Sequence, residues 1–196
     1  MKKILTLTLA LILAISLCAC GKEPAASATV ANPVHEGTPE EILEATGIRL
    51  DAPEGATGAV YAWIEGDAPI SQVIFQLDGK EYCYRAQPTA VLSITASIGE
   101  DEATASDLLK TLNDGTNVGA VLAGMYYDEW KSAALVDLAS SREGVVAFND
   151  GKEGFIAWLD VVPGVLYSLS MDKGATQDLL MNTADTCFVP LQGNAG

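Results

Sequence analysis

The feature that most restricts the fold of this chain is a β-hairpin signal. Asp78-Gly79 separates two stretches, 70–77 and 80–86, that are rich in β-branched and aromatic residues. Asp-Gly suits a type I′ turn, in which both central residues need a positive φ. A two-residue turn also fixes the register, and the predicted cross-strand pairs are Phe75 with Tyr82 and Val73 with Tyr84 on one side, and Ile74 with Cys83 and Gln72 with Arg85 on the other. We expect the aromatic side to face the core.

Further strands are predicted from short apolar runs that are bounded by turn residues. The predicted strands are 59–64, 90–98, 145–148, 154–159 and 165–171. The strands at 145–148 and 154–159 form a second hairpin around residues 149–152. The tetrapeptide Asp-Gly-Lys-Glu occurs at both 78–81 and 150–153. An internal duplication is one explanation, but the flanking sequences differ, which favours repeated use of the same turn chemistry.

Three helices are predicted. Thr38-Pro39-Glu40-Glu41 combines a capping box with proline at the first helical position, so a helix runs to about Thr46 and ends before Gly47. Ile42, Leu43 and Ala45 are its apolar candidates. Helices are also predicted at 104–113 and 175–188, the latter with Leu179, Leu180, Ala184, Cys187 and Phe188 as buried candidates. The region 118–130 shows no clear pattern.

These elements predict an α+β fold: a single, mainly antiparallel β-sheet of six to eight strands with N-terminal, middle and C-terminal helices packed on it. A chain of 196 residues, less a leader, is long enough for one ordinary domain. We expect this domain to cover residues 38–190, followed by a tail at 191–196.

The first residues are typical of an export signal. Lys2 and Lys3 precede an uncharged apolar run of 14 residues, Ile4–Leu17, which is too short to span roughly 30 Å of hydrocarbon. The run ends in Leu17-Cys18-Ala19-Cys20-Gly21, which resembles the lipobox of bacterial lipoproteins. That resemblance implies cleavage after residue 19 and a lipid anchor on Cys20. The alternative is an ordinary secretory signal that releases a soluble protein.

Residues 20–37 are rich in Ala, Ser, Thr and Pro and predict a flexible tether with a span of about 20–25 Å. Without residues 1–19 the chain keeps 9 basic and 26 acidic residues, a formal charge of −17. Nucleic acid is therefore excluded as a partner, because it binds basic surfaces. The negative charge also disfavours electrostatic attachment to anionic lipid, so the anchor at Cys20 is the expected contact with the cell membrane, on its extracytoplasmic face.

Several short motifs occur in a characteristic order. They are Pro53-Glu54-Gly55-Ala56 after the first helix, Gln72-Val73, Tyr82-Cys83-Tyr84-Arg85-Ala86, Gly124-Met125-Tyr126-Tyr127 with Trp130, Trp158, and Tyr167-Ser168-Leu169-Ser170. With the lipobox, this order resembles a family of uncharacterised secreted lipoproteins of Gram-positive bacteria that share a domain of unknown function. The resemblance implies location and fold, and it implies no mechanism.

No catalytic or metal-binding set stands out. The one histidine, His35, lies in the predicted tether, where it cannot be held beside a nucleophile. Ser170-Met171-Asp172-Lys173 matches the S-x-x-K pattern of penicillin-recognising enzymes but is predicted at a strand end, without a Lys-Thr-Gly element. The acidic clusters at 100–102 and 128–129 lack the spacing of a calcium loop, and there is no zinc-type cluster. We expect no cofactor.

Two sets of residues are candidates for binding or for a covalent bond. Six aromatic residues suit either a ligand platform or the core: Tyr61, Trp63, Tyr126, Tyr127, Trp130 and Trp158. Of these, Tyr126, Tyr127 and Trp130 are the candidate partner surface. Cys83 and Cys187 are candidates for a disulfide, which an oxidising location permits, although a buried free thiol explains Cys187 equally well.

The chain has an export signal, and its sequence shows no group of catalytic residues. This combination favours a non-enzymatic binding module whose partner is an envelope protein, a peptide or a glycan. The alternative is an envelope hydrolase that uses carboxylates alone, because the 26 acidic residues include many pairs that folding can bring together. A transporter's substrate-binding protein is less favoured, since two lobes around a cleft usually need a longer chain.

Overall fold

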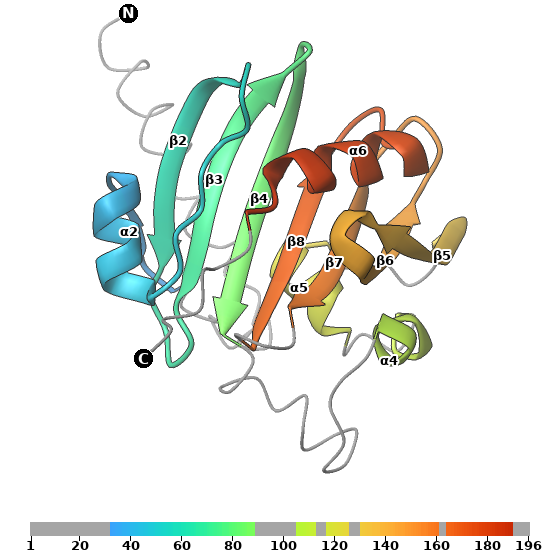
Figure 1. Ribbon diagram of the computed structural model, residues 1–196, viewed down its shortest axis with the longest axis horizontal. Helices are drawn as coiled ribbons and strands as arrows, with labels where there is room; N and C mark the ends of the chain where they lie inside the picture. Colours follow the sequence, from blue (N-terminus) through green and yellow to red (C-terminus); the bar gives the residue numbers. More distant parts are fainter. Residues whose placement is uncertain (1–31, 89–104, 113–116, 126–129, 161–163, 190–196) are drawn as a thin grey trace, which may run out of the picture. The chain divides into compact units, whose positions relative to one another are not determined.

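The computed structural model describes residues 32–88, 105–112, 117–125, 130–160 and 164–189. These residues form an eight-stranded antiparallel sheet with the strand order β1-β2-β3-β4-β8-β7-β6-β5 (Figure 1). The strands are β1 Val34–Glu36, β2 Thr57–Ile64, β3 Ile70–Leu77, β4 Lys80–Pro88, β5 Ser132–Leu138, β6 Arg142–Phe148, β7 Gly154–Asp160 and β8 Val165–Met171. The α-helices are α2 Pro39–Thr46, α4 Ala105–Lys110, α5 Val118–Ala123 and α6 Gln177–Cys187, and a 3-10 turn spans Ala139–Ser141. The predicted α+β class is confirmed.

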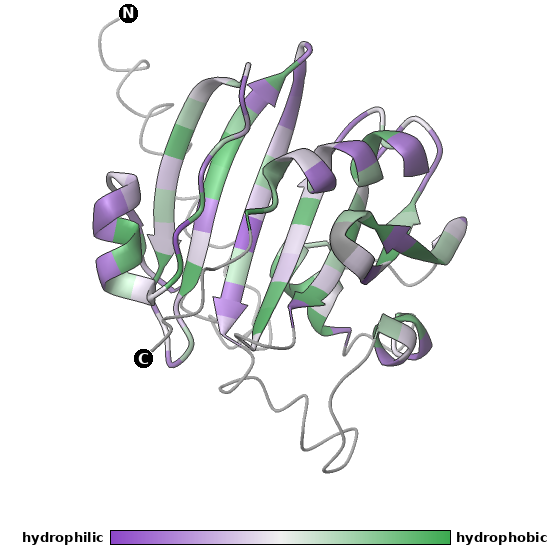
Figure 2. Cartoon of the chain, viewed as in Figure 1, coloured by the Kyte–Doolittle hydropathy of each residue, from purple (hydrophilic) through white to green (hydrophobic). Residues whose placement is uncertain are grey.

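The first hairpin has the predicted register. Phe75 pairs with Tyr82, Val73 with Tyr84, Ile74 with Cys83 and Gln72 with Arg85. Asp78 and Gly79 both have positive φ, 52° and 72°, as a type I′ turn requires. Figure 2 shows apolar and polar residues alternating along these strands. The side chains of Phe75, Tyr82 and Tyr84 are buried, so the aromatic side is the core side.

The front face of the sheet, the face with Phe75, Tyr82 and Tyr84, carries the main core. Helix α6 packs on β5, β6, β7 and β8, in front of the sheet in Figure 1. It buries Leu180, Ala184 and Cys187, while Leu179 and Phe188 are partly buried. The helix begins after its N-cap, Thr176, whose hydroxyl accepts the Leu179 N–H at 3.3 Å. The predicted C-terminal helix is thus part of the core.

Helix α2 packs on β2 and β3. Both arms of its capping box are present, between Thr38 and Glu41, and Gly47 ends the helix with φ of 75°. Ile42 is buried as predicted. Leu43 and Ala45, also predicted to be apolar contacts, are exposed, because an eight-residue helix lying on one face buries a narrow stripe. Thr46 takes the second buried position, and its hydroxyl lies 2.7 Å from the Ser71 hydroxyl on β3.

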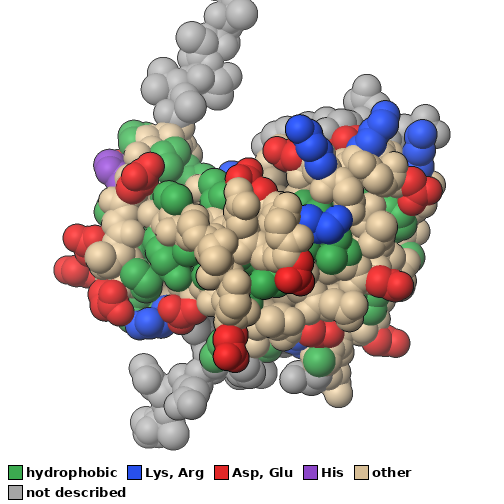
Figure 3. Space-filling model, turned by 90° about the horizontal axis from the view of Figure 1, so that it is seen from above, with side chains coloured by type: hydrophobic (Ala, Val, Ile, Leu, Met, Phe, Trp, Pro, Cys, Tyr) green, Lys and Arg blue, Asp and Glu red, His purple; other side chains and the backbone are tan. Residues whose placement is uncertain are grey.

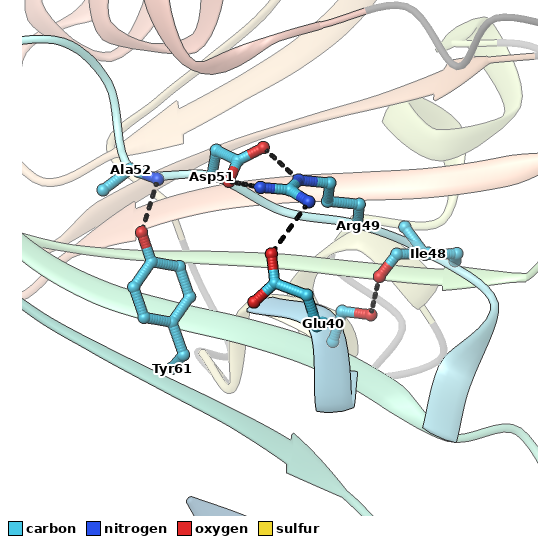
Figure 4. Close-up of polar contacts among 7 residues, drawn as sticks. Glu40, Ile48, Arg49, Asp51, Ala52 and Tyr61 are labelled. Carbon is cyan, nitrogen blue, oxygen red and sulfur yellow. Dashed lines mark hydrogen bonds and ion pairs between the residues drawn. The ribbon is translucent and has the colours of Figure 1, made fainter. Parts of the chain in front are cut away.

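The segment after α2 continues across the front face in an extended form. Ile48 and Leu50 are buried in the core, and between them Arg49 points outward. Figure 4 shows the Arg49 guanidinium donating to both Asp51 and Glu40, at 2.8 and 3.2 Å. The Ala52 N–H donates to the Tyr61 hydroxyl at 3.3 Å. Alternation of buried and paired residues therefore fixes this segment without regular secondary structure.

The back face, which carries Cys83, Arg85 and Ser170, is covered in part by α4 and α5. Helix α4 contacts β5 and β6, and α5 contacts β4, β7 and β8. Asn117 caps α5 by accepting the Ala120 N–H at 2.8 Å. A Cβ at Gly119 would lie 2.7 Å from the Ala157 Cβ, so glycine allows α5 to approach the sheet closely. The region 118–130, which showed no sequence pattern, therefore contains a helix.

The N-terminal boundary differs from the prediction. Residues 34–36 were assigned to the tether, but they form β1 at the edge of the sheet, with His35 opposite Trp63. The His35 ring stacks on Trp63 with centroids 5.0 Å apart, and its Nε2 lies 3.0 Å from Glu65 Oε2. His35 is therefore a packed edge residue rather than a solvated linker residue. The prediction missed β1 because its pairing with β2 and the stacking of His35 on Trp63 join residues far apart in the sequence, which a local pattern does not indicate.

Candidate functional site

A groove of about 710 Å³ opens on the back face, beside the first hairpin. This volume lies in the range of small-molecule sites, about 300–1,000 Å³. Its walls come from β3, β4, the end of β8 with the following turn, and the C-terminal end of α5. The lining residues are Ile74, Gly79, Lys80, Glu81, Tyr82, Cys83, Arg85, Ala123, Gly124, Ser170, Met171, Asp172, Lys173 and Gly174.

Arg85 forms one end of the groove. Its Nε donates to the Gln72 side-chain oxygen at 2.8 Å, and its Nη1 donates to the Leu122 carbonyl at the end of α5, at 2.9 Å. These two bonds hold the guanidinium in one orientation. A Cβ at Gly124 would lie 2.9 Å from Nη1, so the glycine leaves room for the guanidinium. Gly124 also ends α5 with φ of 74°, a conformation that favours glycine.

Two lysines lie toward the other end of the groove, on neighbouring turns. Lys80 follows the turn of the first hairpin, and Lys173 follows β8. The Lys80 ammonium lies beside Gly174, where an added Cβ would be 3.1 Å from Nζ. Glu81 and Asp172 also line the groove, which therefore has three cationic and two anionic side chains. In a chain of net charge −15, an excess of positive charge in one groove stands out. Figure 3 shows several Lys and Arg side chains along one edge of the molecule, with Asp and Glu side chains beside them and across the rest of the view.

The middle of the groove holds a thiol and a hydroxyl. Cys83 Sγ donates to the Gln72 side-chain oxygen at 3.7 Å, and the Ser170 hydroxyl donates to the Cys83 carbonyl at 3.4 Å. Burial raises the pKa of the Cys83 thiol, and the nearby Arg85 charge offsets part of that rise. The thiol form is therefore favoured, so Cys83 is poorly suited to act as a nucleophile.

The candidate disulfide is not formed, because both Cys83 and Cys187 are free. Cys83 is on the back face beside Ser170. Cys187 belongs to the front-face core, together with Tyr82 and Tyr84. Successive residues of a strand point to opposite faces, which puts the sheet itself between the two thiols. Burial raises the pKa of Cys187 to about 12, in keeping with an inert core thiol.

The S-x-x-K match also falls in the groove, since Ser170 and Lys173 both line it. Ser170 is in β8 rather than at the start of a helix, and the next helix, α6, begins at Gln177. The histidine is not available either, because His35 is in β1, opposite Trp63. The groove thus has charged and polar donors suited to binding, and its lining includes no imidazole base.

The candidate aromatic surface is only partly described. Tyr126 and Tyr127 lie outside the described residues, as does the predicted strand at 90–98. Trp130 is 7% exposed and packs edge-on against Phe155, with centroids 5.3 Å apart. It therefore belongs to a small core under α5 rather than to a partner surface. Trp158 is fully buried, and Tyr61 and Trp63 are partly buried.

Sequence reasoning did not find the groove. Its charged residues, Lys80, Arg85 and Lys173, come from three separate segments and form no motif. One available signal was the predicted register, which placed Arg85 and Gln72 together on the side away from the aromatic residues. A long charged residue on an inner strand, with no acidic residue opposite, marks a position where a partner has to come from elsewhere.

Within the described ranges, no cluster of three or more His, Cys, Asp or Glu side chains has the arrangement of a metal site. In the same part of the chain, no helix is both long enough and apolar enough to cross a membrane. The chain matches no family model, and searches among curated proteins and among solved structures found no similar protein.

Proposed function

We propose that this protein is a lipid-anchored extracytoplasmic binding module, and that the groove beside Arg85 is its binding site. The anchor is the acylated Cys20, and the partner is a component of the cell envelope, whether protein, peptide or glycan. The observation that carries the proposal is the groove itself, a cavity of about 710 Å³ with preorganised polar groups on a rigid sheet.

Two features favour binding over catalysis at this site. The Cys83 thiol is held in its protonated form by burial, and Ser170 bonds to a main-chain carbonyl. Among the described residues, neither group is hydrogen-bonded to a side-chain base of the kind that activates a nucleophile. Arg85, by contrast, is fixed by two hydrogen bonds, and a fixed donor loses little conformational entropy when a ligand binds.

The anchor is tested by acyl labelling of cells that express Cys20→Ala. We expect labelling to be abolished and the protein to be released from the membrane fraction, because the thiol that accepts the lipid is gone. Cys18→Ala is the matched control, since Cys18 lies two residues earlier in the same segment. Labelling that persists in Cys20→Ala, or that is lost in Cys18→Ala, would contradict the assignment of Cys20.

The binding site is tested by photo-crosslinking in intact cells. A photoreactive residue replaces Glu81, which is exposed and lines the groove, and in a second variant it replaces Asn182, which is exposed on α6 on the front face. We expect discrete adducts from position 81 and none from position 182. The adduct mass separates a protein, a peptide and a glycan. Equal crosslinking from both positions would show that the groove is not the binding site.

A further inference from the structure

The three arginines of the chain differ in their ionic partners. Arg49 pairs with Glu40 and Asp51 at 3.2 and 2.8 Å, and Arg142 pairs with Asp185 at 2.8 Å. Arg85 instead donates to two neutral acceptors, an amide oxygen and a main-chain carbonyl. Among the described residues, no carboxylate pairs with Arg85. This is unusual, because guanidinium and carboxylate groups pair readily.

The arrangement leaves donor capacity at Arg85. A guanidinium has five N–H bonds, and the two hydrogen bonds described above use one at Nε and one at Nη1. Within the described residues, Arg85 donates to no other oxygen atom, although the Cys83 thiol lies close enough to interact with the guanidinium. Arg85 is half-buried and lines the groove, so its remaining donors are shielded from bulk water while the groove leaves them accessible to a ligand.

Like Arg85, the two lysines of the groove have no ionic partner among the described residues. Of the ion pairs among the described residues, none involves Lys80 or Lys173. Both lie on the same groove as Arg85. Three cations that have no ionic partner among the described residues therefore line one groove. The arrangement costs electrostatic energy that an anion in the groove would relieve, because charges in a partly desolvated cleft interact more strongly than in water.

From this geometry we infer that the groove binds the anionic group of its ligand, a carboxylate or a phosphate, with Arg85 as the anchor and Lys80 and Lys173 as supporting charges. The inference rests on the proposed function, since it names the chemistry of the ligand at the same site. Planar carboxylate and phosphate oxygens fit the fork of a guanidinium. Glu81 and Asp172 also line the groove, and their charges act on Cys83 in its middle. They disfavour ligands of high negative charge and favour those that also carry a donor or a cation.

The test uses the arginine side-chain NMR signals of the full chain, purified in a non-ionic maltoside detergent and labelled with ¹⁵N-arginine. Three Nε–H resonances are expected, from Arg49, Arg85 and Arg142, and Arg49→Lys and Arg85→Lys assign them. Inorganic phosphate and acetate are titrated separately, with chloride as a third titrant at matched ionic strength. We expect the Arg85 resonance to shift saturably with phosphate or acetate, while the two paired arginines shift little. The anion with the lower Kd indicates whether the ligand carries a carboxylate or a phosphate.

A pair of double variants tests the role of the lysines. Lys80→Ala with Lys173→Ala removes the two groove cations, and Lys131→Ala with Lys152→Ala removes two exposed lysines that do not line the groove. Both double variants lower the net charge equally. Because the two lysines lie toward the other end of the groove from Arg85, we expect a modest rise in the Kd for the anion, about two- to threefold, in the groove variant and no measurable change in the control.

The inference is overturned if the Arg85 signal shows no saturable shift, if chloride gives the same shift, or if the two double variants weaken binding equally. These results are independent of crosslinking at position 81. If crosslinking occurs but the Arg85 signal does not respond to anions, the groove remains the proposed binding site, and the inference that its ligand is anionic is rejected. An anion response without crosslinking would support the ligand class and overturn the proposed envelope partner.

Discussion

A chain that ends at Lys173 is expected not to fold cooperatively, because α6 covers the front face of the sheet. Leu180, Ala184 and Cys187 are buried against that face, and the Phe188 ring packs edge-on against Tyr167 and Trp158 at 5.5 and 6.2 Å. Burial of a large apolar side chain stabilises by about 1.5–3 kcal/mol, and a domain has about 5–15 kcal/mol in total. Truncation removes several such contributions and exposes the aromatic core.

The measurement is a thermal melt with near-ultraviolet circular dichroism, in which the truncated protein should show no cooperative transition. Two point variants measure how much individual side chains of α6 contribute to stability. Leu180→Ala creates a cavity under the helix and should cost about 2–5 kcal/mol, which lowers the Tm by roughly 10 °C. Asn182→Ala, on the exposed side of the same helix, should stay within about 0.5 kcal/mol of wild type. A cooperative melt of the truncated chain near the wild-type Tm would show that α6 is a peripheral arm.

The second large effect is expected from Asp185→Ala, which leaves the partly buried Arg142 without its ionic partner. The Arg142 side chain is 9% exposed and that of Asp185 is 29% exposed, and Nη2 lies 2.8 Å from Oδ1. The same Oδ1 accepts the Ala139 N–H at 2.9 Å. Burial lowers the pKa of Arg142, and Asp185 partly restores it. Removing one partner of a fully buried pair typically costs about 3–5 kcal/mol, because the remaining charge stays desolvated. Since Asp185 is partly exposed, we expect a cost at the lower end of that range.

Urea unfolding of four proteins separates the ion pair from its packing. Asp185→Ala should be strongly destabilised, whereas Arg142→Met with Asp185→Ala should recover part of the loss, since no charge is then buried. Methionine still fills the space beside Phe188, where the guanidinium carbon lies 3.7 Å from the ring centroid. Asp178→Ala, exposed on the same helix, is the control. If the double variant is no more stable than Asp185→Ala, the ion pair is not the cause.

The two stability predictions concern the front face, whereas the proposed ligand site lies on the back face. Variants of Asp185 or Leu180 should therefore change the free energy of unfolding without changing the affinity for an anion in the groove. Variants of Lys80 and Lys173, whose side chains make no ion pair among the described residues, should do the reverse. This separation makes it possible to recognise a binding defect that is only a consequence of unfolding.

Local patterns predicted most of the regular elements. Turn chemistry at Asp78-Gly79 was enough to give every pair of the first hairpin, because a two-residue turn allows no slack. The second hairpin, the strand at 165–171 and both terminal helices were predicted from the same kinds of signal. β5 was missed, since its alanines lack the β-branched and aromatic side chains that identify a strand.

What the sequence by itself determined was therefore local: the turns, the caps, and which side of each strand is apolar. Only the tertiary structure decided how those elements meet. The pairing of β4 with β8 places Arg85 opposite Ser168 and Cys83 opposite Ser170, so that Arg85 and Lys173 line the same groove, and α5 closes the groove with a carbonyl at its end. These contacts join residues more than thirty positions apart, and their energy depends on packing and charge in three dimensions. The same reason explains why Trp130 is buried, why His35 joins the sheet, and why Cys83 and Cys187 lie on opposite faces.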